Sequence, residues 1–140
     1  EKSIAWSIGQ ASAREIDKYG IRIATEKAML RALEKFSTPP DLIIVDGVLP
    51  IRLWTGKQIT KIRGESSFPA IAAASVLAKQ SRDELMKRLA KKYSSYGLEK
   101  NKGYGTKLHR SCLINKGPSK LHRKSFLSKI IINPNQSLIN

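Results

Sequence analysis

The chain has 140 residues, 41% of them apolar and 26% charged, so it is long enough for one domain with a hydrophobic core. Its longest nearly uncharged stretch, around residues 68–78, is much shorter than the roughly 20 apolar residues of a membrane-spanning helix, and we expect no membrane partner. The 26 Lys and Arg residues against 11 Asp and Glu residues give a net charge of +15, which favours a polyanion such as nucleic acid as the partner.

The N-terminal part of the chain predicts a short strand and two helical stretches. Residues 4–8 alternate between apolar and polar side chains, as a strand does. Ser12 and Glu15 then have the spacing of a capping box at the start of a helix. Gly20 interrupts this helix, and a second helical stretch with apolar residues four apart continues until Pro39 stops it.

The middle of the chain indicates an α/β architecture. Residues 42–45 form a continuous apolar run, which is typical of a strand covered by helices on both faces of a sheet. A second strand is expected over residues 58–63. One of the serines at 66–67 is expected to begin a long helix from Pro69 to about Lys92.

The second half of the chain carries most of the positive charge. Residues 79–129 contain 15 basic and 3 acidic residues, a balance of +12, whereas residues 1–78 contain 11 and 8, a balance of +3. Short basic helices are expected around Leu108 and Phe126, and a flexible tail is expected over residues 130–140. A solvated face of lysines is the alternative interpretation of this charge.

Cys112 is the only cysteine, which fits a reducing, cytoplasmic compartment and excludes an internal disulfide bond. A buried thiol is the preferred interpretation over a reactive one. Cys112, His109 and His122 are possible zinc ligands. These three side chains are too few and too irregularly spaced for a closed zinc site. The two histidines are therefore expected to contact phosphate or to cap local loops.

Two carboxylates are candidates for metal chemistry. Asp46 ends the buried strand and precedes Gly47, so it lies at the carboxyl edge of a sheet, although an Asp in a tight turn has the same pattern. Asp83 lies one helical turn beyond Lys79, and an exposed ion pair with that lysine is the alternative. Mg²⁺ prefers oxygen ligands, and metal-assisted attack on a phosphodiester would unite the two acids.

The chain resembles bacterial ribonuclease HII, a type 2 ribonuclease H, in four segments that occur in the family's order and spacing. The segments are Val45-Asp46-Gly47; Ile71 to Lys79 followed by Ser81-Arg82-Asp83 and Met86; Lys102-Gly103-Tyr104 with Thr106; and His122-Arg123 with Ser125-Phe126. The resemblance runs from Ile4 to about Phe126. It implies an α/β, ribonuclease H-like domain over residues 1–129, with a mixed sheet flanked by helices and a basic helical substrate-binding region from about residue 93.

The resemblance also implies a function. The family cuts the RNA strand of RNA–DNA hybrids and nicks DNA duplexes on the 5′ side of embedded ribonucleotides by two-metal hydrolysis, using Mg²⁺ or Mn²⁺. A monomer is expected. The implied catalytic metal ligands are Asp46 and Asp83, Tyr104 would pack on the sugar beside the ribonucleotide, and the other implied substrate-binding residues are Ser75, Lys79, Lys102 and Arg123.

The sequence departs from the family pattern at its N-terminus. The family's Asp-Glu pair on the first strand, with the Gly-Arg-Gly that follows, is absent, and the resemblance makes residues 4–8 the third strand and residues 42–46 the fourth. With two of four metal ligands and two strands missing, we expect the chain alone to be inactive and poorly folded. A catalytically inactive nucleic-acid-binding fragment is one alternative, and a small basic RNA-binding protein unrelated to the nuclease is another.

Four single residues also depart from the family pattern. Glu65 stands where the family usually has Asp, and Ser67 stands where a basic residue is common, which leaves phosphate contacts of this segment open. Asn101 replaces the usual His, and Gly105 replaces the usual Pro. Both changes are expected to loosen the loop that carries Tyr104.

Overall fold

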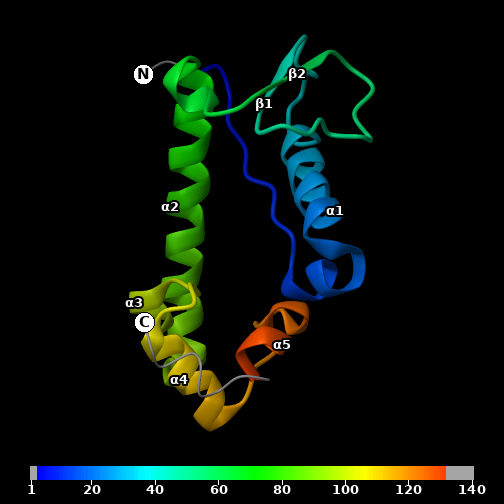
Figure 1. The fold of residues 1–140 in the computed structure, drawn as a ribbon. Helices are drawn as coiled ribbons and strands as arrows, with labels where there is room; N and C mark the ends of the chain where they lie inside the picture. Colours follow the sequence, from blue (N-terminus) through cyan, green and yellow to red (C-terminus); the bar gives the residue numbers. More distant parts are fainter. Residues whose placement is uncertain (1–2, 132–140) are drawn as a thin grey trace.

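The computed structural model describes residues 3–131, and these form an α/β structure with a small parallel sheet. The expected fold class is confirmed at this level. Figure 1 shows α2 as a long column facing α1 and the two strands, with the shorter helices α3, α4 and α5 gathered at one end. The elements are α1 (Ala13–Leu33), β1 (Ile43–Asp46), β2 (Gln58–Lys61), the 3-10 turn η1 (Gly64–Ser66), α2 (Pro69–Lys92), the 3-10 turn η2 (Ser94–Tyr96), α3 (Leu98–Asn101), α4 (Lys107–Lys116) and α5 (Lys124–Ile131).

Helix α1 begins as the sequence predicts and ends earlier. The Ser12 side chain accepts a hydrogen bond from the Glu15 backbone N–H, and the Glu15 carboxylate accepts one from Ser12 N–H, which completes the capping box. The helix breaks at Gly20, whose φ of 80° and ψ of 159° are outside the helical region. It ends at Leu33 rather than near Pro39, because the next residues tighten into turns with i to i−3 hydrogen bonds.

The strand expected over residues 4–8 is not formed. This segment runs in an extended path between α1 and α2 (Figure 1) and forms its hydrogen bonds with α1 and the turn that follows it. The Ser7 hydroxyl donates to Ala32 O at 2.6 Å, and Lys35 Nζ donates to Ile8 O at 2.6 Å. A strand requires a neighbouring strand for its backbone groups, and within residues 3–131 the sheet contains only β1 and β2.

The sheet holds the end of β1 next to η1. Strands β1 and β2 are parallel, with Asp46 opposite Lys61 at the carboxyl end, so the expected second strand stops two residues before Arg63. No serine caps α2. The turn η1 occupies that position, Phe68 becomes the N-cap, and its N–H donates to Gly64 O at 2.8 Å.

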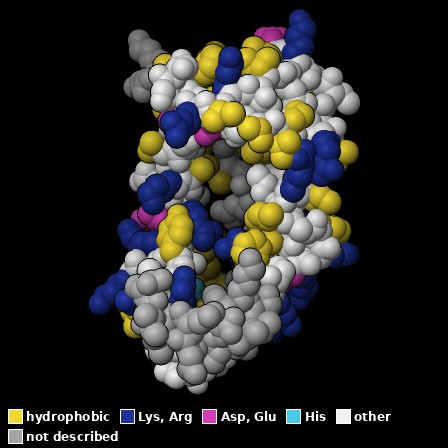
Figure 2. All heavy atoms as spheres, in the orientation of Figure 1, with side chains coloured by type: hydrophobic (Ala, Val, Ile, Leu, Met, Phe, Trp, Pro, Cys, Tyr) yellow, Lys and Arg dark blue, Asp and Glu magenta, His cyan; other side chains and the backbone are white. Residues whose placement is uncertain are grey.

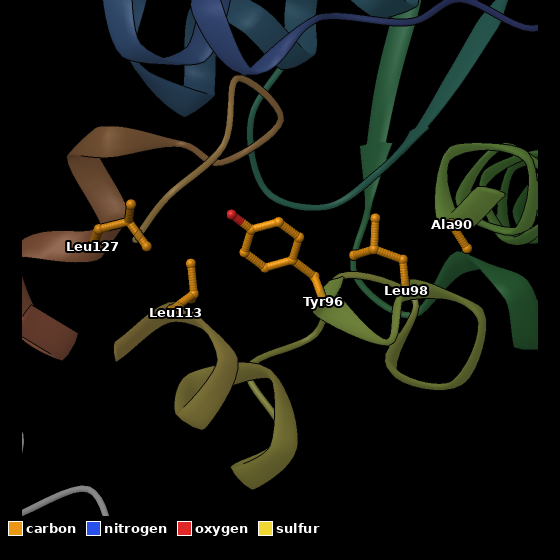
Figure 3. Close-up of a cluster of buried hydrophobic side chains, with 5 residues drawn as sticks. All are labelled: Ala90, Tyr96, Leu98, Leu113 and Leu127. Atoms are coloured by element: carbon orange, nitrogen blue, oxygen red, sulfur yellow. The ribbon is translucent and has the colours of Figure 1, made fainter. Parts of the chain in front are cut away.

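The main hydrophobic core lies at the end of the molecule where α3, α4 and α5 gather beside α2, which we call the helical end. Figure 3 shows Tyr96 in the middle of this cluster, between side chains from α2, α3, α4 and α5. Cys112 is half-buried and packs against the cluster as an ordinary core side chain. The buried members are Ala90, Tyr96, Leu98, Leu113 and Leu127.

Several apolar side chains of α2 and of the N-terminal segment are exposed to solvent. Along α2, Ile71 is buried and Leu85 and Leu89 are half-buried, whereas Ala74 and Ala78 between them are exposed. Val76 on α2 is 63% exposed and Trp6 is 65% exposed. Figure 2 shows a hollow in this face of the molecule, with hydrophobic side chains and Lys and Arg residues around its rim.

The flexible tail predicted over residues 130–140 lies mostly outside the described residues. Residues 130–131 belong to α5. None of the helices in the described part of the chain has the length and hydropathy that a bilayer crossing requires.

Candidate functional site

Asp46 lies at the carboxyl end of β1, as the sequence predicts, and a single contact fixes its side chain. Its Oδ1 accepts a hydrogen bond from Gly64 N–H at 3.1 Å, and the side chain is otherwise exposed. Gly64 is buried against Ile71, and a Cβ atom at position 64 would lie 2.4 Å from Ile71 Cδ1. A side chain at position 64 would therefore force the end of the Ile71 side chain to move.

Glu65 directly follows Gly64 in η1, so its backbone lies near Asp46. Its side chain is exposed. The sequence pattern did not identify Glu65 as a metal ligand. Its proximity to Asp46 depends on the Gly64 hydrogen bond across 18 residues, which no local pattern reveals.

Asp83 lies on the middle turns of α2 and pairs with Lys79, as its alternative interpretation predicts. Lys79 Nζ lies 3.4 Å from Asp83 Oδ2. Asp83 Oδ1 is buried and has no hydrogen-bond partner among the described residues. A buried carboxylate oxygen without a donor is destabilising, and a cation or an added donor at this position would satisfy it.

The structure does not bring Asp46 and Asp83 together. Ile71 packs beside Gly64, and Asp83 follows Ile71 by 12 residues along the same helix, a distance of roughly 18 Å at 1.5 Å per residue. Among the described residues, no group of three or more His, Cys, Asp or Glu side chains is arranged to hold a metal ion. The shared metal role of the two acids therefore remains a prediction.

The loop that carries Tyr104 packs against α2 near Asp83. The Arg82 guanidinium donates to Lys102 O at 3.4 Å and lies 5.9 Å from the centre of the Tyr104 ring. Tyr104 is 57% exposed, so one face of its ring is available to a ligand. Lys102 and Tyr104 are thus brought to α2 at Arg82, which precedes Asp83 in the chain.

Asn101 stabilises this loop and does not loosen it, contrary to the expectation from the sequence. Its side chain is buried, its Nδ2 donates to Tyr96 O at 2.6 Å, and its Oδ1 accepts from Gly103 N–H at 2.8 Å. The Gly105 carbonyl accepts from Arg110 Nε at 2.9 Å. An asparagine has both a donor and an acceptor, so it satisfies two backbone groups here.

The remaining predicted residues are more dispersed. Ser75 is exposed on α2, one turn before Lys79. Arg123 precedes α5, and its guanidinium carbon lies 4.3 Å from the centre of the Phe126 ring. The predicted substrate-binding residues thus lie along α2 and the helical end, while Asp46 lies at the sheet.

The family model and the similar proteins found by comparison all belong to one family. A family model described as ribonuclease HII matches residues 2–129. The ribonuclease HII of Prochlorococcus marinus strain NATL1A is 76% identical over 131 residues, which are 94% of this chain and 67% of that protein. The ribonuclease HII of Synechococcus sp. strain WH7803 is 60% identical over 129 residues, 92% of this chain and 66% of that protein. The chain spans about two thirds of the length of these relatives.

Proposed function

The chain belongs to the ribonuclease HII family, and we propose that the complete protein is an endonuclease that cuts the RNA strand of RNA–DNA hybrids. We further propose that it nicks duplex DNA on the 5′ side of an embedded ribonucleotide. The observation that carries the proposal is Asp46, an exposed carboxylate fixed at the carboxyl edge of the sheet by Gly64. Open α/β sheets place their ligands at this edge.

The proposed cofactor is Mg²⁺ or Mn²⁺, with Asp46 as a ligand. Oδ1 of Asp46 accepts the hydrogen bond from Gly64 N–H. Because the Asp46 side chain is exposed, its other oxygen is available to a hard cation. The resemblance implies Asp83 as a second ligand, and Glu65, which directly follows Gly64, is a further candidate. When bound, the metal would activate water and stabilise the leaving oxygen of the phosphodiester.

The proposed substrate contacts lie on the basic half of the chain. Tyr104 would pack on the sugar beside the ribonucleotide, and its exposed ring supports that role. Phosphate contacts are proposed for Lys79, Lys102 and Arg123, with Ser75 close to the site. A duplex that runs along α2 toward the helical end would pass these residues in order, and the balance of +12 over residues 79–129 would attract it.

The test is Asp46→Asn in the complete protein, assayed on a DNA duplex with one ribonucleotide. We expect loss of metal-dependent cleavage by at least about 100-fold with duplex affinity nearly unchanged, because the amide keeps the Gly64 hydrogen bond and loses the charge. Cleavage at the rate of the unmodified protein would refute the metal role of Asp46.

A second candidate is nucleic-acid binding without cleavage. It is favoured by the absence of a three-ligand metal group among the described residues. The two candidates predict the same salt-sensitive binding, so binding alone does not separate them. Metal-dependent cleavage by the complete protein would support the nuclease, and saturating binding without any cleavage would support the alternative. The cytoplasmic location and the monomeric state remain predictions.

A further inference from the structure

His109 and His122 face each other through their Nε2 atoms. The two atoms are 3.0 Å apart, which is hydrogen-bond distance. His109 lies on α4 and is only 4% exposed, while His122 lies in the turn before α5 and is half-buried. The pair therefore links two elements of the helical end through a contact shielded from water.

The hydrogen bonds around the pair determine where each proton lies. The Ser119 backbone N–H donates to His122 Nδ1 at 3.0 Å, so this nitrogen carries no proton. A neutral His122 must then carry its proton on Nε2 and donate it to His109 Nε2. His109 in turn carries its proton on Nδ1 and donates it to Tyr104 O at 2.9 Å.

With His122 neutral, every ring nitrogen of the pair has a hydrogen-bond partner. The proton on His122 Nε2 and the proton on His109 Nδ1 are donated in the same direction, toward Tyr104 O. The Ser119 hydroxyl also lies 2.9 Å from His122 Nδ1. The buried His109 ring is therefore held at both of its nitrogens, between His122 and the Tyr104 backbone.

The surroundings of His122 disfavour its charged form. Burial and the neighbouring His109 hold the pKa of His122 below its usual range. The Tyr96 ring packs on His122, with the ring centres 4.8 Å apart. Four cations and one carboxylate line the same pocket as His122, and the carboxylate is already bonded to α5. These residues are Arg14, Asp17, Lys18, Lys120 and Lys124.

We infer that His109 and His122 are positioning residues, which as a neutral pair hold the Tyr104 backbone in the orientation that presents its ring to the substrate. The inference rests on the proposed substrate role of Tyr104. Tyr104 O also accepts Thr106 N–H at 2.8 Å, so loss of the histidine contact leaves the loop attached and allows Tyr104 to reorient. Affinity for a ribonucleotide-containing duplex is therefore expected to fall when the His109 contact is removed.

The proton positions can be tested independently of any nuclease activity. Long-range proton–nitrogen NMR spectra of the complete protein, labelled at histidine, report the tautomer of each ring. At pH 7.5 we expect the Nδ1–H form for His109 and the Nε2–H form for His122. The opposite tautomer at either residue, or a charged ring at this pH, would overturn the inference whatever the protein cleaves.

The positioning role can be tested with a pair of variants at one position. His109→Asn keeps a donor near the position of Nδ1 and cannot reach His122, whereas His109→Leu keeps neither contact. Fluorescence anisotropy without metal would measure the affinity of the complete protein for a duplex with one ribonucleotide at pH 7.5. A matched all-DNA duplex provides the baseline for each variant.

The expected results differ between the two variants. His109→Leu should lose about 5- to 10-fold in affinity for the ribonucleotide duplex, relative to the all-DNA duplex, a loss of the size of one hydrogen bond. His109→Asn should keep the relative affinity of the unmodified protein. Relative affinity of His109→Leu equal to that of the unmodified protein would overturn the inference. No preference of the unmodified protein for the ribonucleotide duplex, with the expected tautomers present, would instead refute the role proposed for Tyr104, and with it the inference.

Discussion

Gly64 determines the position of Asp46, and its substitution provides a test of the sheet-edge site. A Cβ atom at this position would collide with Ile71, so we expect Gly64→Ala to lower the free energy of unfolding by about 1 to 3 kcal/mol. The same change should reduce cleavage, because the displaced backbone no longer donates to Asp46. Urea denaturation and cleavage rates of the complete protein measure the two effects.

Gly105 provides a matched control for this stability measurement. A Cβ atom there would meet only the Arg110 guanidinium, with Nε at 3.7 Å and Nη2 at 3.9 Å, which is ordinary van der Waals contact. Gly105→Ala should therefore change the free energy of unfolding by well under 1 kcal/mol. Equal stability of Gly64→Ala and Gly105→Ala would contradict the packing argument for Gly64.

Glu65 and Asp83 can be separated as partners of Asp46 by neutral substitutions. If the geometry identifies the partner, Glu65→Gln should raise the Mg²⁺ concentration needed for half-maximal cleavage by about 10-fold or more, since a hard cation loses a charged oxygen ligand. Asp83→Asn should then have a smaller effect. Titration of cleavage with Mg²⁺ decides between them, and the reverse order would favour the assignment from the resemblance. Glu84→Gln, an exposed acid beside Asp83, is the control.

The sequence predicts which residues belong to the site better than it predicts which residues contact them. Asp46 follows from a local rule, the carboxylate at the end of a buried strand. The Asp46 contact with Gly64, and hence the proximity of Glu65, depends on how the two strands pair. The support that Asn101 gives to the Tyr104 loop was missed for the same reason, because it depends on a buried contact with Tyr96.

At the scale of elements, Asp17 connects α1 to the start of α5. Its carboxylate accepts hydrogen bonds from the backbone N–H groups of Ser125 and Lys124 and from the Ser125 hydroxyl, at 2.7 to 3.0 Å. These donors, with Ser125 contributing most, hold the pKa of Asp17 below its usual value of 3.8. The carboxylate therefore acts as a cap on α5 supplied from more than 100 residues away.

Asp17→Ala should destabilise the complete protein at pH 7 and have less effect in acid. Because the pKa of Asp17 is lower in the folded state, its stabilisation is complete above the unfolded pKa near 3.8 and is lost as pH falls through the folded value. Thermal melts at pH 7 and near pH 2.5 should therefore show a difference from the unmodified protein that shrinks in acid. Asp41→Ala, at an exposed carboxylate before β1, is the control. A difference that stays constant with pH would argue against the cap.

Local rules succeed for helices and fail for the N-terminal strand. The Ser12 capping box, the break at Gly20 and the proline that starts α2 depend on residues within one turn, and all three are present. The expectation over residues 4–8 rested on alternation alone, and that segment bonds to α1 and the following turn instead. Strand formation depends on a partner strand, which a local pattern does not supply.

At the scale of the whole molecule, the described residues leave much apolar surface uncovered. Ile62 is 71% exposed, and Val76 and Trp6 are also exposed. Soluble monomers seldom expose so many large apolar side chains. We therefore expect the 140-residue chain in isolation to bind the dye ANS and to melt without a cooperative transition. A sharp two-state melt with no dye binding would contradict this expectation.

The charge of the whole molecule determines how its nucleic-acid affinity responds to salt. Each phosphate contact made by Lys or Arg releases counterions, so the logarithm of affinity should fall linearly with the logarithm of salt concentration. Lys102→Gln removes one proposed phosphate contact and should reduce the slope of that line by about 1. Lys57→Gln removes the same charge from the less basic half, at an exposed position beside β2.

The comparison of these two variants separates a phosphate contact from a general effect of net charge. If the positive charge acts only as a diffuse field, both substitutions lower the affinity equally, since each changes the net charge by one unit. If Lys102 contacts phosphate, only Lys102→Gln changes the slope, and it does so to the same extent for duplexes with and without a ribonucleotide. Sequence-independent affinity would then come from the basic half, and discrimination of the ribonucleotide from Tyr104 and the histidine pair that positions it.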